Sequence, residues 1–209
     1  MYIDISVPTG PATPEWPGDT PFSCGWAWDM SQGASVNVST ITMSPHVGTH
    51  ADAPLHVKAG GAAADQLPLA AFHGPVTVVD VTHHTGAISA EALAVLLDSG
   101  PVSRVILKTG RTVATGTFPD SWPALTPDCA RTLTERGLLL LGVDCPSVDD
   151  RESKTLDVHH ALFDNGALVL ENLDLRAVEA GMYEITAFPA RFTGLDAAPV
   201  RAVLTKRPF

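Results

Sequence analysis

The chain has 209 residues, of which 45% are apolar and 17% charged, so it can bury a core and is not a disordered protein. Its formal net charge is −10 and its pI about 5.1, which argues against a nucleic-acid partner, because binding to phosphates needs a basic surface. We expect neither a membrane span nor a signal peptide, because no apolar stretch is long enough and the first residues lack a basic start. Its three widely spaced cysteines do not suggest a disulfide framework, so we expect a cytoplasmic protein.

The first half of the chain is predicted to hold strands, loops and one short helix. Residues 3–7 alternate apolar and polar side chains, as a half-buried strand does, and the Pro- and Gly-rich residues 8–21 predict a loop. β-Branched residues predict a strand at 36–43. Further strands are expected at 76–81 and 105–108, with a helix at 90–97 between them that Gly100 and Pro101 stop.

The second half alternates helices with apolar strands. Thr126 and Pro127 predict the start of a helix, and Gly137 predicts its end. The apolar run 138–143 predicts a strand buried on both faces. A helix at 156–163 and a turn at Asn165–Gly166 precede strands at 167–170, 183–188 and 200–205. We therefore predict a single α/β domain with a mixed sheet over residues 1–209.

The most informative segment places His46, His50, Asp52 and His56 within eleven residues. Imidazole and carboxylate are ligands that zinc and similar metals prefer. Gly and Pro within the segment make a long helix doubtful, so we expect a tight loop or single turn, in which Gly48 lets the backbone pass close to a metal. Asp52 has two oxygens and can bridge two ions, while His56 can face the site without being a ligand. Histidines in a polar surface loop are the alternative.

A second polar group lies far downstream. His159 and His160 lie on the predicted helix, and Glu171 ends a predicted strand, where site residues are often found. His159 and Glu171 could complete a two-metal site begun by the first cluster; alone, each has an ordinary structural explanation. Cys145 follows the strand 138–143, and we expect it to be a partly buried structural cysteine rather than a catalytic thiol.

The sequence resembles a known enzyme family. The pattern His-x-Gly-Thr-His-x-Asp-x-Pro-x-His at 46–56 is similar to the signature of the cyclase-like metal-dependent hydrolases at every fixed position. Residues 15–19, 153–157, 191–196 and 199–202 resemble the kynurenine formamidase (arylformamidase) branch of that family. The resemblance implies a swivelling β/β/α fold and two Zn²⁺ ions per subunit, with Mn²⁺ possible. It also implies a homodimer in which pieces of one subunit reach the other's site.

The same resemblance implies a role for each candidate residue. His56 would be the proton donor and acceptor, and Trp16 would lie against the aromatic part of the substrate. Asp52 and Glu171 would bridge the two ions. The full set of implied metal ligands is His46, His50, Asp52, His159 and Glu171.

The reaction that the resemblance implies is hydrolysis of N-formyl-L-kynurenine to L-kynurenine and formate, in tryptophan degradation. Metal-activated water suits this reaction, and the Gly-x-Ser-x-Gly elbow of serine hydrolases is absent from the sequence. One alternative is another amide or cyclic-imide hydrolase of the superfamily, such as an isatin hydrolase. Another is a non-catalytic zinc-binding protein, against which His56 argues, because a ligand set needs no extra base beside it. A structural module with incidental histidines is the third.

Overall fold

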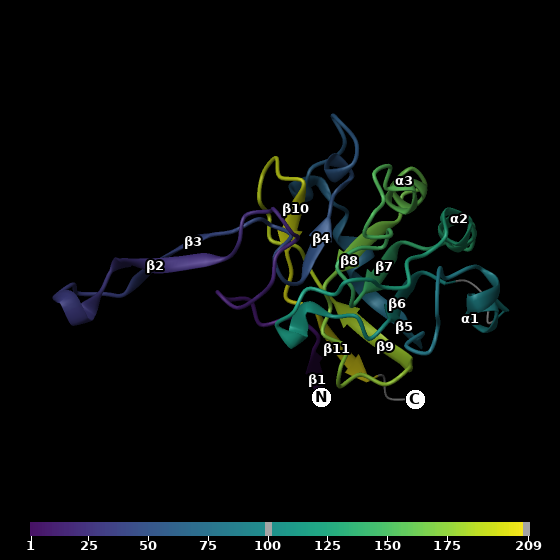
Figure 1. Cartoon of the computed structure of the whole chain (residues 1–209), viewed down its shortest axis with the longest axis horizontal. Coiled ribbons are helices and arrows are strands. Elements are labelled where there is room, and N and C mark those ends of the chain that lie inside the picture. The colour runs from purple at the N-terminus through teal and green to yellow at the C-terminus, as the bar shows by residue number, and fades with distance from the viewer. Residues whose placement is uncertain (99–101, 207–209) are drawn as a thin grey trace.

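A nine-stranded mixed sheet forms the body of the protein (Figure 1). The computed structural model describes residues 1–98 and 102–206. The strand order is β1-β11-β9-β5-β6-β7-β8-β4-β10; β5 to β8 run parallel to one another, and the remaining pairings are antiparallel. The strands are β1 (Tyr2–Asp4), β4 (His50–Asp52), β5 (His73–Asp80), β6 (Arg104–Lys108), β7 (Leu140–Val143), β8 (Leu168–Glu171), β9 (Gly181–Thr186), β10 (Ala197–Pro199) and β11 (Val203–Lys206).

Three helices connect the parallel strands, because parallel neighbours cannot be joined by a tight hairpin. They are α1 (Ala94–Asp98), α2 (Pro127–Glu135) and α3 (Asp157–Phe163). Leu133 of α2 and Leu162 of α3 lie in one buried cluster with Leu141 and Val143 of β7. Every residue of β7 is buried, which confirms the strand predicted to be covered on both faces.

The opposite face of the sheet curls around a second core. This core contains Ala51 of β4 and Ala198 of β10 from one end of the strand order. It also contains Ile185 of β9 and Leu204 of β11 from the other end, and Ile5, which follows β1. Side chains from both ends of the strand order therefore meet in one buried cluster, which holds the sheet in its curled form.

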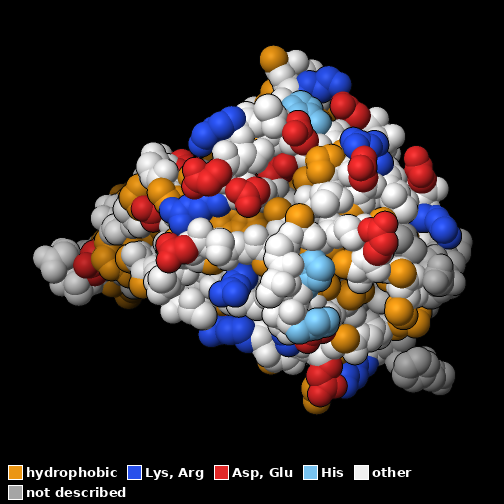
Figure 2. Space-filling model, turned by 45° about the vertical axis from the view of Figure 1, so that its right-hand side comes forward, with side chains coloured by type: hydrophobic (Ala, Val, Ile, Leu, Met, Phe, Trp, Pro, Cys, Tyr) orange, Lys and Arg blue, Asp and Glu red, His pale blue; other side chains and the backbone are white. Residues whose placement is uncertain are grey.

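A two-stranded arm projects from this body (Figure 1). It consists of β2 (Ser23–Trp28) and β3 (Val38–Thr42), which pair antiparallel in a sheet of their own. Every residue of both strands is exposed. Hydrophobic side chains gather along the arm, whereas charges of both signs are interspersed over the visible face of the body (Figure 2).

The structure confirms the α/β fold class and most of the predicted elements. Thr126 caps α2 by accepting the N–H of Cys129 at 3.1 Å, and Gly137 has the positive φ of 93° that a helix C-terminus favours. The helix predicted at 90–97 is a 3₁₀ turn at Glu91–Leu93 followed by α1. Its predicted stop at Gly100 and Pro101 lies outside the described residues.

Several differences concern the strands. The strand predicted at 3–7 ends at Asp4. The strand predicted at 200–205 begins only at Val203. The residues before it, 197–199, form the separate edge strand β10, where Pro199 costs no ladder hydrogen bond. The arm strand β2 was not predicted. None of the helices in the described part of the chain has the length and apolar character needed to span a bilayer.

Candidate metal centre

The pairing of β4 with β8 places three polar side chains on one face of the sheet. In this antiparallel register His50 lies opposite Glu171. Asp52, two residues along β4, points to the same face as His50, because side chains alternate along a strand. Ala51 points to the other face and is fully buried in the core. The prediction of a loop or single turn for 46–56 was therefore wrong for residues 50–52, where strand pairing sets the geometry.

Gly48 forms the turn that leads from His46 into β4. Its φ of 74° is one that glycine adopts readily, and a Cβ atom built there would lie 2.1 Å from Thr9 Oγ1. Thr9 therefore leaves no room for a side chain at this position, and the approach of the backbone to a metal stays a prediction. The carbonyl of Gly48 also accepts the Nδ1–H of His50 at 2.9 Å. This contact directs the Nε2 lone pair of His50 towards Asp52.

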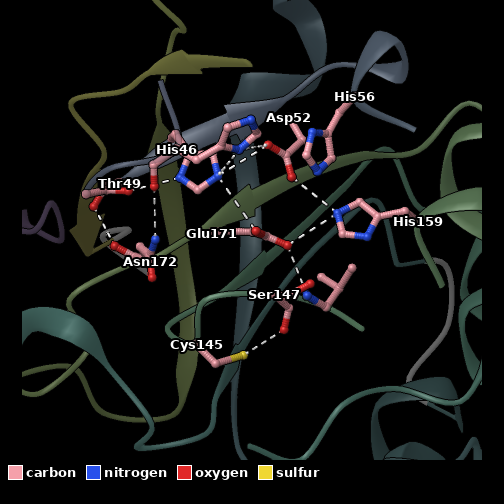
Figure 3. A network of polar contacts seen from close by, with 12 residues as sticks. His46, Thr49, Asp52, His56, Cys145, Ser147, His159, Glu171 and Asn172 are labelled. Atoms are coloured by element: carbon pink, nitrogen blue, oxygen red, sulfur yellow. Dashed lines mark hydrogen bonds and ion pairs between the residues drawn. The ribbon is translucent and has the colours of Figure 1, made fainter. Parts of the chain in front are cut away.

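Three potential ligand atoms, one from Asp52 and one from each of two histidines, lie close together (Figure 3). Asp52 Oδ1 lies 3.1 Å from His46 Nδ1 and 3.2 Å from His50 Nε2, and those two nitrogens are 3.1 Å apart. Within the described residues this buried oxygen has no hydrogen-bond partner. Atoms bound tetrahedrally to one zinc ion at 2.0–2.1 Å lie about 3.3 Å apart. The orphaned oxygen and the two nitrogens therefore fit a divalent metal ion.

A second set of contacts links the same carboxylates to α3. Asp52 Oδ2 lies 3.2 Å from His159 Nε2. Glu171 places Oε1 3.4 Å from His159 Nε2 and Oε2 3.7 Å from His50 Nε2 (Figure 3). Each carboxylate thus reaches histidines on both sides of the cluster. This spacing is what two ions with shared carboxylates would require, and the bridging roles remain a prediction.

The structure brings all six predicted cluster residues together from five separate segments: the turn before β4, β4 itself, the 3₁₀ turn after it, α3 and β8. Potential ligand atoms of His50, Asp52 and Glu171 lie within 4.8 Å of one another, and so do those of His46, Asp52 and His56. His56 ends a short 3₁₀ turn after β4, and its ring centroid lies 4.4 Å from that of His46. The geometry alone leaves His56 open as a ligand or as a neighbour of the ligands.

Asp149 supports His159 from outside the cluster. Its Oδ2 lies 2.6 Å from His159 Nδ1. Its two oxygens also accept the N–H groups of Val158 at 2.9 Å and His159 at 3.1 Å, in the first turn of α3. The carboxylate therefore fixes the imidazole with Nε2 towards Asp52. Such outer carboxylates orient metal-binding histidines in many metalloproteins.

Asp196 plays a similar part for two histidines of the first cluster. Its Oδ2 lies 2.9 Å from His46 Nε2 and 3.3 Å from His56 Nδ1. Asp149 and Asp196 were not among the predicted site residues. No spacing signal could have found Asp196, because 140 residues separate it from His56 and only the pairing of β10 with β4 joins them.

The carboxylates determine how the buried histidines hold protons. Burial alone would lower the pKa of His46, but the hydrogen bond to Asp196 and the adjacent Asp52 carboxylate raise this pKa to about 10. Burial likewise opposes the charged form of His159, yet Asp149, Asp52 and Glu171 raise its pKa well above the ordinary value. Without a metal, protons on these histidines thus offset the negative charge of the carboxylates, and a metal ion must displace the protons to bind.

A cavity of about 430 Å³ opens onto the cluster. His46, His56 and Glu171 line it together with Trp16 and Phe118. Trp16 is 38% exposed, and its ring packs edge-on against Phe118 at 5.4 Å between centroids. The histidines and Glu171 thus share one cavity with an apolar aromatic wall, which is how binding sites for aromatic molecules are commonly built.

Cys145 is a structural residue. It is buried, and its thiol donates to the carbonyl of Ser147 at 3.2 Å. Burial raises the pKa of the thiol, and the charges of Asp144 and Glu171 raise it further. The thiolate that a nucleophile needs is therefore disfavoured. The interpretation as a structural cysteine is confirmed, although Cys145 is fully rather than partly buried.

Comparison with known proteins gives consistent results. The Cyclase family model, described as "Putative cyclase", matches residues 3–150. A solved structure described as a potential metal-dependent hydrolase with cyclase activity is 28% identical, with a TM-score of 0.85 over 100% of this chain and 98% of that one. A predicted metal-dependent hydrolase from Bacillus stearothermophilus is also 28% identical, with a TM-score of 0.84 over 99% and 98%.

Isatin hydrolase A from Labrenzia aggregata, solved with benzyl benzoate, has a similar fold. It is 22% identical, with a TM-score of 0.82 over 100% of this chain and 94% of that one. At this identity the likeness concerns the fold.

We expect the affinity of the cluster for Zn²⁺ to rise with pH. His46 has a pKa of about 10 and holds a proton at neutral pH, and a zinc ion must displace it. Each displaced proton adds about tenfold in apparent affinity per pH unit below that pKa. Competition with a chromophoric chelator at pH 6, 7 and 8 measures this slope. An affinity that does not change over this range would contradict the assignment of His46 as a ligand.

Proposed function

The chain belongs to the Cyclase family, and from that premise we propose that it is a metal-dependent hydrolase of aryl formamides, with N-formyl-L-kynurenine as its substrate. The observation that carries the proposal is the pair of carboxylates, Asp52 and Glu171, each of which reaches histidines on both sides of the cluster. Two structures that are 28% identical are described as metal-dependent hydrolases, which supports the reaction class.

We propose that the cluster holds two Zn²⁺ or Mn²⁺ ions, since imidazole and carboxylate do not select sharply between them. His46 and His50 would hold one ion and His159 the other, with Asp52 and Glu171 shared. Such ions lower the pKa of a bound water to about 7 and polarise a carbonyl oxygen. Gly48, Asp149 and Asp196 keep the three imidazole rings in place, so that the ligand atoms already converge.

His56 is proposed as the proton carrier. Its side chain is 29% exposed and lines the cavity, while its Nδ1 lies beside Asp196. In formamide hydrolysis, water oxygen bonds to the formyl carbon, the C–N bond breaks and the aniline nitrogen gains a proton. His56 can take a proton from the attacking water and deliver it to this nitrogen. Asp196 orients the ring for both transfers.

Trp16 is proposed to contact the aryl ring of the substrate. Its ring forms part of the cavity lining and is anchored edge-on by Phe118 and by the largely buried Trp122, at 5.4 and 5.9 Å between centroids. An aromatic pair of this kind contributes about 0.5–1.5 kcal/mol beyond the burial of area. Trp16 nevertheless remains 38% exposed, so its main role is not to cover the edge of the core.

The test is an absorbance assay of formylkynurenine hydrolysis with zinc-loaded protein, with isatin as a second substrate. We expect turnover of formylkynurenine that a chelator abolishes. His56→Ala should retain its metal and lose about 10²–10⁴-fold in kcat, the range typical of a general acid–base. Faster turnover of isatin would favour the cyclic-imide alternative, and no turnover of either substrate would favour a zinc-binding protein. An unchanged rate in His56→Ala would remove His56 from the mechanism.

We also propose that the protein is a homodimer in which the β2–β3 arm packs on the second subunit. A two-stranded ribbon is at best marginally stable alone in water. The arm exposes large apolar side chains, which mark interaction surfaces. They include Trp26, Trp28, Val38 and Ile41 on the strands and Met30 in the 3₁₀ turn that joins them. The family resemblance implies the same assembly.

Sedimentation or light scattering tests this proposal. The wild-type protein should have twice the 22.0 kDa mass of the chain. The double variant Trp26→Ser and Ile41→Ser should shift towards the monomer, because each side chain is at least 60% exposed on the arm. Val95→Ser is the matched control, since Val95 is 89% exposed on α1 and should not affect the assembly. A monomeric wild-type protein would refute the proposal.

A further inference from the structure

Beyond the aromatic wall, the cavity is lined by two cationic side chains, Arg151 and Lys154. They stand out in a chain with 13 basic and 23 acidic residues. Lys154 forms no hydrogen bond and no ion pair with any residue in 1–98 or 102–206. The carboxylates in the lining are Glu171, which belongs to the metal centre, and Asp19, which accepts the N–H of Thr20 at 2.6 Å. The ammonium group of Lys154 is therefore available to a ligand.

The backbone that carries Lys154 is held in place between β7 and α3. Ser153 donates its N–H to the carbonyl of Asp150 at 3.0 Å, and its hydroxyl accepts the N–H of Leu156 at 3.1 Å. Leu156 itself has a φ of 49°, which side chains other than glycine seldom adopt. Strained conformations of this kind persist only where the surroundings fix them, and they cluster at binding sites. The Cα of Lys154 is thus fixed five residues before His159.

Arg151 contributes a second positive charge at a fixed place. Its Nη1 donates to the backbone carbonyl of Asp120 at 3.1 Å and lies 3.4 Å from the Asp120 carboxylate. Its guanidinium carbon lies 5.6 Å from the centre of the Phe118 ring. Arg151 is therefore bound to the aromatic wall and has donors to spare, because a guanidinium carries five N–H groups.

We propose that Lys154, with the neighbouring charge of Arg151, forms an anion subsite that binds a carboxylate on the side chain of the substrate. This inference rests on the proposed function, and it narrows the substrate class to aryl formamides that carry a carboxylate. A carboxylate paired with an ammonium group gives a short, charge-assisted hydrogen bond. Aryl amides without a carboxylate, including isatin, would gain nothing from Lys154. Asp19 supplies the opposite charge in the same cavity, which suits an ammonium group beside the carboxylate.

The kinetic test compares two formamides that differ in the amino-acid side chain. Formylkynurenine carries the carboxylate, and 2-formamidoacetophenone has the same formyl-aryl ketone without it. Lys154→Met should lower kcat/KM for formylkynurenine about tenfold, as the loss of one charged hydrogen bond does, and leave that for 2-formamidoacetophenone within twofold. Lys154→Arg should restore most of the loss. Lys58→Met is the control, because Lys58 is an exposed lysine that pairs with Asp164 outside the cavity.

A binding measurement separates failure of the subsite from failure of the proposed function. Titration with L-kynurenine and with 2-aminoacetophenone needs no turnover. We expect Lys154→Met to weaken kynurenine binding about tenfold and to leave 2-aminoacetophenone unaffected. A wild-type protein that hydrolyses neither formamide refutes the formamidase activity, and the titration still decides the subsite. Equal effects of Lys154→Met on both ligands, or no effect on either, overturn the subsite.

Discussion

The buried carboxylate of Asp52 is the group on which the rest of the site depends. A fully buried charge is costly unless it is paired, and Asp52 is surrounded by the imidazoles of His46, His50 and His159. One of its oxygens still has no hydrogen bond within the described residues. A cation at that point would satisfy the oxygen and both adjacent nitrogens together. The carboxylate whose burial is costly without a cation would thus serve as a ligand to a metal ion.

The position of Asp52 follows from the sheet rather than from the local sequence. β4 is three residues long, and it places its candidate ligands, His50 and Asp52, accurately because it lies between β8 and β10. β8 brings Glu171 opposite His50, and the segment that leads into β10 brings Asp196 beside His46 and His56. Ligands on paired strands are held more precisely than ligands on a free loop. Outside the sheet, the α3 histidine is fixed by Asp149.

Sequence patterns were sufficient for the parts of the molecule that local chemistry determines. The cap at Thr126, the glycine stop at Gly137 and the apolar run of β7 were all predicted and confirmed, because each depends on residues within a few positions. The cluster from His46 to His56 was visible from its spacing, whereas His159 and Glu171 were candidates whose roles the family resemblance implied. The structure brings the predicted residues together, and their individual roles remain proposals.

Features that depend on distant pairing could not be predicted in this way. β4 was missed as a strand, because three residues carry too short a pattern and its neighbours in the sheet come from residues 168–171 and 197–199. Asp149 and Asp196 have no signature of their own, since an outer carboxylate needs only to reach a histidine in space. The arm strand β2 was missed because it packs against no core, so its sequence lacks the alternation of a half-buried strand.

The most direct measurement is the number of metal ions bound per chain, by elemental analysis after loading and dialysis, in the wild-type protein and in Asp52→Asn. Asn keeps the shape of the side chain but removes the charge and one of the two ligand oxygens. If Asp52 and Glu171 are shared between two ions, the wild-type protein should bind two ions per chain and the variant fewer than one. A wild-type protein that holds no ion or only one, or a variant that still holds two, would contradict a centre built around Asp52.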